Sequence, residues 1–261
     1  MKSSNIHKLT GGVTILTAAY LLKDFYSAAG TEDLSWIIAP TAWLAELFSG
    51  LSFTPEPGYG WVDVVHNVVI APVCAGVNFL IIAFCMSAFQ VLWKKSSAKA
   101  LISGIVLAGA ASYLLTIIAN ATRIILAVAL FNLDIYNEWL TPDMVHRVAG
   151  IVVYYLLLCI YSQSINWCVS GQNNHGHVGE NPYRTQTLLL VPLFWYLLFS
   201  VGVPFAHNSL RADPELFLRH ATTVGAVTFV LTLVIYTIRH CFLCVRNNRY
   251  NSHQRTLSSH K

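Results

Sequence analysis

Long apolar stretches recur along the chain, and each has about 20 residues, the length that an α-helix needs to cross about 30 Å of hydrocarbon. The 261-residue sequence is 55% hydrophobic and only 11% charged, whereas a soluble domain carries about 25% charged residues. We therefore predict an all-α, polytopic helical membrane protein with about 6–8 transmembrane helices. The predicted spans are residues 9–29, 73–93, 101–131, 145–167, 187–206 and 220–243.

A shorter apolar run at residues 34–50 contains Pro40 and Glu46, and we treat it as a helix at the membrane interface. With this segment assigned, the sequence suggests five parts. They are an N-terminal transmembrane helix (1–34), a central helical region (35–168), a polar cytoplasmic loop (169–186), a C-terminal two-helix extension (187–243) and a basic cytoplasmic tail (244–261).

The positions of lysine and arginine orient the predicted helices, because cytoplasmic loops are enriched in these residues. Lys94, Lys95 and Lys99 crowd one loop, and Arg239 begins a basic stretch that runs to Lys261. Both regions are therefore assigned to the cytoplasmic side. The segments that then face outward are 51–72, 132–144 and 207–219. Membrane topology also accounts for the net charge of +4, so we expect a lipid bilayer and no nucleic acid as a partner.

Three reactive side chains are expected at the outer ends of the predicted spans. Cys74 begins its span on the outer side. Arg123 lies in the next span, about 36 Å along the helix from Lys99. His146 follows the external residues Thr141-Pro142-Asp143 and lies in the first turn of the span after that. Three different helices thus bring a thiol, a guanidinium and an imidazole to one level.

These three groups suffice for acyl-transfer chemistry. The thiolate is the reactive form of cysteine, and a nearby cation lowers the pKa of a thiol. A histidine can take a proton or return it to a leaving amine. An arginine can stabilise a developing oxyanion through its planar set of N–H groups.

Three further residues are expected to support this site. Asn120 lies three residues before Arg123 on the same helical face, where it is placed to orient the guanidinium or bind the substrate backbone. Asn78 lies one turn beyond Cys74 and is a candidate for the same task. Gly150 continues the face of His146, with Tyr154 one turn further, and permits close helix approach.

Each of these residues also has an ordinary structural explanation, since a cysteine packs as a small apolar residue and an arginine near a helix end extends to the interface.

Asp63 and His66 share a predicted helical face just before Cys74, which makes His66 a rival base. Cys241 and Cys244 form a CxxC pattern, but they lie at the predicted cytoplasmic end of the last span, where we expect no redox role. The pair His175 and His177 lacks the further ligands of a metal site. We expect no metal and no cofactor.

Three segments resemble motifs of the exosortase/archaeosortase family. Pro-Val-Cys-Ala-Gly-Val-Asn-Phe (72–79) is similar to its cysteine motif, Asn-Ala-Thr-Arg-Ile (120–124) to its Asn-x-x-Arg segment, and His-Arg-Val-Ala-Gly (146–150) to its His-x-x-x-Gly segment. The resemblance covers residues 35–168, and the compact layout is similar to the exosortase K branch.

The resemblance implies a multi-pass cysteine peptidase or transpeptidase of the bacterial inner membrane, with its active site near the periplasmic face. Cys74 would be the nucleophile, His146 the general acid and base, and Arg123 the stabiliser of the thiolate or oxyanion. The implied partners are membrane-anchored substrate proteins with a C-terminal Pro-Glu-Pro tail, and a lipid or polysaccharide acceptor. The literal Pro55-Glu56-Pro57 of this chain is internal, so a loop role is favoured over self-processing.

Two other classes of function stay open at this point. A transporter or channel would require ionisable residues near the bilayer midplane, and Lys23-Asp24 is the only charged pair well inside a predicted span. A thiol–quinone oxidoreductase would require a pair of cysteines on the outer side, where only Cys74 is expected.

Overall fold

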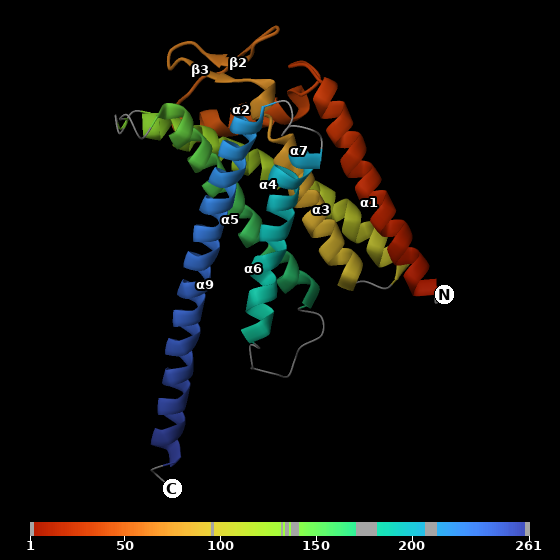
Figure 1. Cartoon of the computed structure of the whole chain (residues 1–261), viewed down its shortest axis with the longest axis vertical. Coiled ribbons are helices and arrows are strands. Elements are labelled where there is room, and N and C mark those ends of the chain that lie inside the picture. The colour runs from red at the N-terminus through yellow and green to blue at the C-terminus, as the bar shows by residue number, and fades with distance from the viewer. Residues whose placement is uncertain are drawn as a thin grey trace.

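The computed structural model describes residues 3–94, 97–131, 133, 136, 141–170, 182–206 and 213–258, and most of these residues are helical (Figure 1). Five helical segments in this part of the chain are long and apolar enough to cross a membrane. They are Pro72–Lys94, Ala98–Phe131, Pro142–Cys168, Leu189–Ala206 and Pro214–Phe242. The predicted all-α membrane fold is confirmed, while the exact number of crossings stays a prediction.

The helices in chain order are α1 (Ser3–Ala28), α2 (Ser35–Ser49), α3 (Val77–Lys94), α4 (Ala98–Phe131), α5 (Pro142–Ser170), α6 (Pro182–Leu197), α7 (Val203–Ala206) and α9 (Pro214–Ser258). A π-helical turn at Leu198–Gly202 joins α6 to α7. Helix α3 lies at the centre, because it packs against α1, α4, α5 and α6 and most of its side chains are buried.

Helix α1 packs along α3 (Figure 1). Its side chains Ile15 and Ala19 belong to the same buried core as α3. The helix has 26 residues, enough to cross a bilayer at 1.5 Å per residue, but it is not among the five helices that also meet the hydropathy requirement. The prediction that residues 9–29 span the membrane is therefore not tested by the structure.

The last predicted span, residues 220–243, agrees at its C-terminal end with the apolar segment Pro214–Phe242. Helix α9 itself continues beyond this segment to Ser258 and has 45 residues, which corresponds to about 68 Å. Much of the predicted loop 169–186 lies outside the described residues, including His175 and His177.

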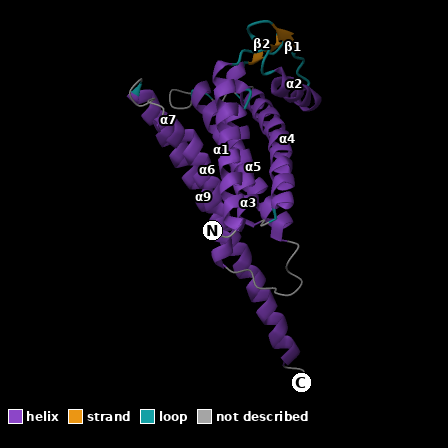
Figure 2. Cartoon of the chain, turned by 90° about the vertical axis from the view of Figure 1, so that its right-hand side faces the viewer, coloured by secondary structure: helices purple, strands orange, loops and turns teal. Residues whose placement is uncertain are grey.

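A small antiparallel sheet caps one end of the helices, and the sequence analysis did not predict it (Figure 2). Its strands are β1 (Thr54–Glu56), β2 (Gly60–Asp63) and β3 (Val68–Ile70), in the order β1-β2-β3. The prediction of a helical face shared by Asp63 and His66 was wrong, because Asp63 ends β2 and His66 lies in the turn before β3. Three-residue spacing matches a tight turn as well as a helix.

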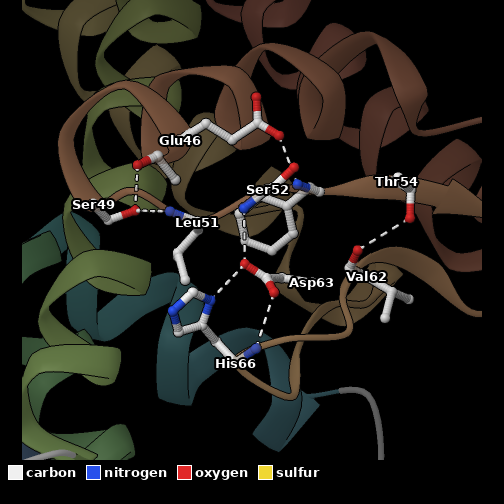
Figure 3. A network of polar contacts seen from close by, with 10 residues as sticks. Glu46, Ser49, Leu51, Ser52, Thr54, Val62, Asp63 and His66 are labelled. Atoms are coloured by element: carbon white, nitrogen blue, oxygen red, sulfur yellow. Dashed lines mark hydrogen bonds and ion pairs between the residues drawn. The ribbon is translucent and has the colours of Figure 1, made fainter.

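Carboxylates attach this sheet to α2 (Figure 3). Glu46 Oε1 accepts a hydrogen bond from the backbone N–H of Phe53 at 2.6 Å, and Asp63 Oδ2 accepts one from the N–H of Ser52 at 2.8 Å. Gly50 ends α2 in the left-handed conformation with φ of 70°, which turns the chain towards the sheet. Helix α2 thereby lies beside the sheet, at the end of the bundle.

The two ends of the described chain lie away from the sheet. The start of α1, the end of α3 and the end of α9 all point to the opposite end of the molecule (Figures 1 and 2). The positions of the basic residues led us to expect that the end of α3 and the C-terminal stretch would lie at the same end of the helices. Which side of a membrane each end faces stays a prediction.

Candidate functional site

Cys74 lies in a single 3-10 turn, Pro72–Cys74, immediately before α3. Its backbone N–H donates a hydrogen bond to the carbonyl of Ala71 at 2.8 Å. The side chain is half-buried. Since α3 itself begins at Val77, the cysteine is carried by the turn at the end of the helix that faces the sheet.

Gly76 connects this turn to α3, and two features of its environment require a glycine. Its φ of +73° lies in the left-handed region that side chains rarely adopt. A Cβ at this position would lie 2.8 Å from Cγ of Asn120 and closer still to its amide nitrogen. Gly76 thus allows the backbone beside Cys74 to lie directly against Asn120 of α4.

We expect Gly76→Ala to destabilise the protein and to disturb the site. The left-handed conformation alone costs a residue with a side chain roughly 1–2 kcal/mol, and the new methyl group must also displace Asn120. The measurement is thermal unfolding of the detergent-solubilised protein, with Gly109→Ala of α4 as the matched control because a Cβ there meets nothing closer than 3.8 Å. Equal transition temperatures for the two variants would contradict this account.

Tyr154 of α5 links the polar residues of α4. Its hydroxyl donates a hydrogen bond to Asn120 Oδ1 and accepts one from Arg123 Nη1 at 3.2 Å. The guanidinium carbon of Arg123 also lies 5.7 Å from the centre of the Tyr154 ring, and Phe79 of α3 stacks on this ring with a centroid separation of 4.7 Å. The tyrosine therefore holds both Asn120 and Arg123 in position.

Arg123 and His146 are in direct contact. Arg123 Nη2 lies 2.7 Å from His146 Nε2. Because a guanidinium can only donate hydrogen bonds, His146 Nε2 must be the acceptor, and the proton of the neutral ring is then on Nδ1. The lone pair of Nε2 cannot accept a proton until this contact with Arg123 is released.

Cys74, Asn120, Arg123 and His146 line one small pocket of about 70 Å³. Its remaining walls are apolar and come from β3 and α4. They are Val68, Val69, Ile70, Ile124, Ala127 and Val128. The structure thus brings the thiol, the guanidinium and the imidazole together at the end of the bundle that carries the sheet.

The two other predicted supporting residues differ in their positions. Gly150 faces the guanidinium, because a Cβ there would lie 3.1 Å from Arg123 Nε. Asn78 does not line the pocket, and its Oδ1 accepts a hydrogen bond from Lys23 Nζ of α1 at 2.9 Å. Lys23 Nζ lies 5.3 Å from the centre of the Tyr26 ring. Asn78 therefore connects α1 to α3 and does not orient Arg123.

Two buried donors at the site, Asn120 Nδ2 and Arg123 Nε, have no hydrogen-bond partner among the described residues. An unmade hydrogen bond of a buried group costs about 1–3 kcal/mol. Among all the residues that the structure describes, no group of three or more His, Cys, Asp or Glu side chains is arranged to hold a metal ion. The polar groups available here are suited to an oxygen atom that accumulates negative charge.

The central position of Tyr154 was not predicted, although its helical spacing from His146 and Gly150 was noted. That spacing was the available signal, because i+4 residues share one helix face and Gly150 faces Arg123. The partner of Lys23 was not predicted either. A lysine within an apolar helix requires a polar contact, but its spacing gave no indication that Asn78 would supply it.

Comparison of the chain with protein-family models, with curated proteins and with solved structures finds no match.

Proposed function

We propose that this chain is a membrane-embedded cysteine peptidase or transpeptidase that resembles the exosortases. The observation that carries the proposal is the single pocket lined by Cys74, Arg123 and His146, which come from three separate helical segments. Each residue alone has an ordinary structural explanation. Three unrelated structural roles do not explain why a nucleophile, a cation and a base all line one pocket of about 70 Å³.

The proposed reaction begins with attack of Cys74 Sγ on the carbonyl carbon of a scissile amide. Arg123 stabilises the oxyanion through its N–H groups, and the C–N bond then breaks. His146 accepts the thiol proton on Nε2 and returns it to the leaving amine. Because Nε2 can accept this proton only after its contact with Arg123 is released, the guanidinium is available when the oxyanion forms. The resulting thioester is resolved by water or by an acceptor nucleophile, which regenerates the thiol.

The proposed substrates are exported, membrane-anchored proteins with a C-terminal Pro-Glu-Pro tail, and the proposed acceptor is a surface lipid or polysaccharide. The proposed location is the bacterial inner membrane, with the pocket on the periplasmic side. The pocket is lined in part by β3, and the sheet lies at the end away from the start of α1 and the end of α9 (Figure 1). This supports the periplasmic side, because the basic tail is expected in the cytoplasm.

The alternative is a transporter or channel without thiol chemistry. Such proteins place ionisable groups in the middle of the bundle. Among the described residues, the buried polar side chains along α3, α4 and α5 are uncharged. They are Ser87, Gln90, Ser112, Thr116, Asn120 and Ser162. This favours the peptidase over the transporter.

The proposal is tested by the mass of a Pro-Glu-Pro-tailed membrane protein in cells with and without the wild-type chain. We expect the tail to be lost only when the chain is present. The mass of the new C-terminus distinguishes hydrolysis from transfer. An intact tail in both strains, together with uptake of a solute that depends on the chain, would contradict the peptidase proposal and support the transporter.

The proposed orientation predicts which cysteine an external reagent reaches. A membrane-impermeant maleimide added to intact spheroplasts is expected to modify Cys74, which is half-buried, in preference to Cys241, which is exposed. The measurement is the mass of labelled tryptic peptides, and permeabilised cells provide the control in which Cys241 also reacts. Preferential labelling of Cys241 in intact spheroplasts would contradict the proposed orientation and indicate the opposite one.

A further inference from the structure

A second polar pair lies beside the pocket, with Asp63 at the end of β2 and His66 in the turn before β3. Asp63 is buried, with 1% of its side chain exposed, and His66 is 45% exposed. Asp63 Oδ2 lies 2.9 Å from His66 Nδ1, and Asp63 Oδ1 accepts the backbone N–H of His66 at 3.0 Å. The carboxylate thus holds both the backbone and the ring of this histidine (Figure 3).

The hydrogen bonds determine which nitrogen of His66 can act as a base. Burial alone would raise the pKa of Asp63, but the N–H groups of Ser52 and His66 and the His66 ring outweigh it and lower the pKa to about 2. Asp63 is therefore a carboxylate at neutral pH, and it accepts a hydrogen bond from the Nδ1–H of His66. The lone pair of the neutral ring is then on Nε2, which points away from Asp63 (Figure 3).

His66 lines a cleft of about 620 Å³ that also includes His146. The other titratable side chains on its walls are Asp143 and Tyr136. The cleft adjoins the pocket of Cys74, because the two share a set of lining residues. These are Val68, Val69, Ala127, Val128 and His146. A molecule bound in the cleft would therefore reach the edge of the smaller pocket.

The two histidines of this cleft have different partners. Nε2 of His146 accepts a hydrogen bond from Arg123. No hydrogen bond to Nε2 of His66 occurs within the described part of the chain. His146 is thus associated with the guanidinium and the thiol, while His66 has an available lone pair at the open side.

We propose that His66, held by Asp63, is the general base that activates a hydroxyl acceptor, and that the 620 Å³ cleft is the binding site of this acceptor. The inference rests on the proposed function. His66 would be a catalytic residue of the second half-reaction, complementary to His146, and Asp63 its positioning residue.

The proposed transfer step begins from the thioester between Cys74 and the acyl group. Nε2 of His66 removes the proton from the acceptor hydroxyl, and the oxygen attacks the thioester carbonyl carbon. The C–S bond breaks, the acyl group passes to the oxygen as an ester, and the Cys74 thiolate recovers its proton from the His66 imidazolium. Water reacts in the same manner and gives a carboxylic acid.

Burst kinetics separate the two half-reactions, and p-nitrophenyl acetate is the probe. With the full-length chain in detergent, rapid release of p-nitrophenolate reports acylation of Cys74, and the steady rate reports deacylation. For His66→Gln we expect an unchanged burst and a steady rate lower by about 10²-fold, in the range of general-base catalysis. His220→Gln is the matched control, since that histidine of α9 bonds to Ser200 and lines neither pocket.

Two additions identify the acceptor chemistry and exclude misfolding. Hydroxylamine, which attacks a thioester without a general base, is expected to restore turnover of His66→Gln and Asp63→Asn. With glycerol present, the wild type is expected to form acetylglycerol in addition to acetate, and His66→Gln to lose both products together.

The outcomes separate this inference from the proposed function. A normal steady rate in His66→Gln would overturn the role of His66 alone. Loss of the burst in this variant would make His66 part of acylation or of the fold and would also overturn it. The absence of any burst in the wild type beyond that of Cys74→Ala would overturn the thiol chemistry, and the inference with it.

Discussion

Replacement of Cys74 by Ala is expected to reduce tail removal by about 10³-fold or more, because no other group of the pocket forms the covalent intermediate. Cys74→Ser should be severely impaired as well, since it keeps the shape of the side chain but not its nucleophilicity. The measurement is the rate at which the shortened substrate appears, followed by mass spectrometry in membranes with matched amounts of each variant.

Cys241→Ala is the control for this experiment. Cys241 is exposed on α9, so its removal should leave both the amount of inserted protein and the processing rate unchanged. Full activity of Cys74→Ala would exclude the thioester mechanism. A loss of membrane insertion in Cys74→Ala would instead show that the cysteine is needed for folding or insertion.

Replacement of Arg123 by Lys is expected to lower kcat by about 10²–10³-fold, the usual effect of removing a donor to an oxyanion. Lysine keeps the positive charge but lacks the planar arrangement of N–H groups. A single ammonium cannot reproduce the contacts that Arg123 makes with Tyr154 at 3.2 Å and with His146 at 2.7 Å. Separate determination of kcat and KM shows whether the loss occurs in the transition state.

Arg147→Lys provides the matched control, because Arg147 follows His146 on α5 but does not line the pocket. Its kcat should equal that of the wild type. If Arg123→Lys were also nearly normal, Arg123 would be an anchor between α4 and α5, and oxyanion stabilisation would have to come from other donors.

The central helices could be predicted closely from hydropathy. The predicted spans 73–93, 101–131 and 145–167 correspond to α3, α4 and α5, with differences of a few residues at their ends. The reason is that a helix between lipid and apolar neighbours needs an apolar sequence on all sides, which leaves a continuous signal. The C-terminal end of α9 has no such signal, because the residues beyond 243 are polar.

The sheet could not be predicted from the same pattern. Its strands have three or four residues each, which is too short to establish an alternating period. Pro55 within β1 also disfavours a strand, although a proline is tolerated in an edge strand such as this one. The sheet is held by Glu46 and Asp63, which bind backbone groups 7 and 11 residues away, and single contacts of this kind leave no repeating pattern in the sequence.

Depth along the predicted helices indicates which side chains are near one another, but not which are in contact. It placed Cys74, Arg123 and His146 at one level, and all three line one pocket. It assigned Asn78 to the same site by assuming a continuous helix from Cys74. The chain instead passes through Gly76 with a positive φ before α3 begins, so the two residues do not share a helix face.

The bond between Lys23 and Asn78 has a consequence for biogenesis. The two residues are 55 positions apart, so at 5–20 residues per second the ribosome makes the partner roughly 3–11 seconds after the lysine. During this interval the ammonium needs water or lipid headgroups, and its place about 8 Å from the end of α1 allows it to reach them. The predicted span 9–29 should therefore enter the membrane early, and α1 should dock only after α3 has been synthesised.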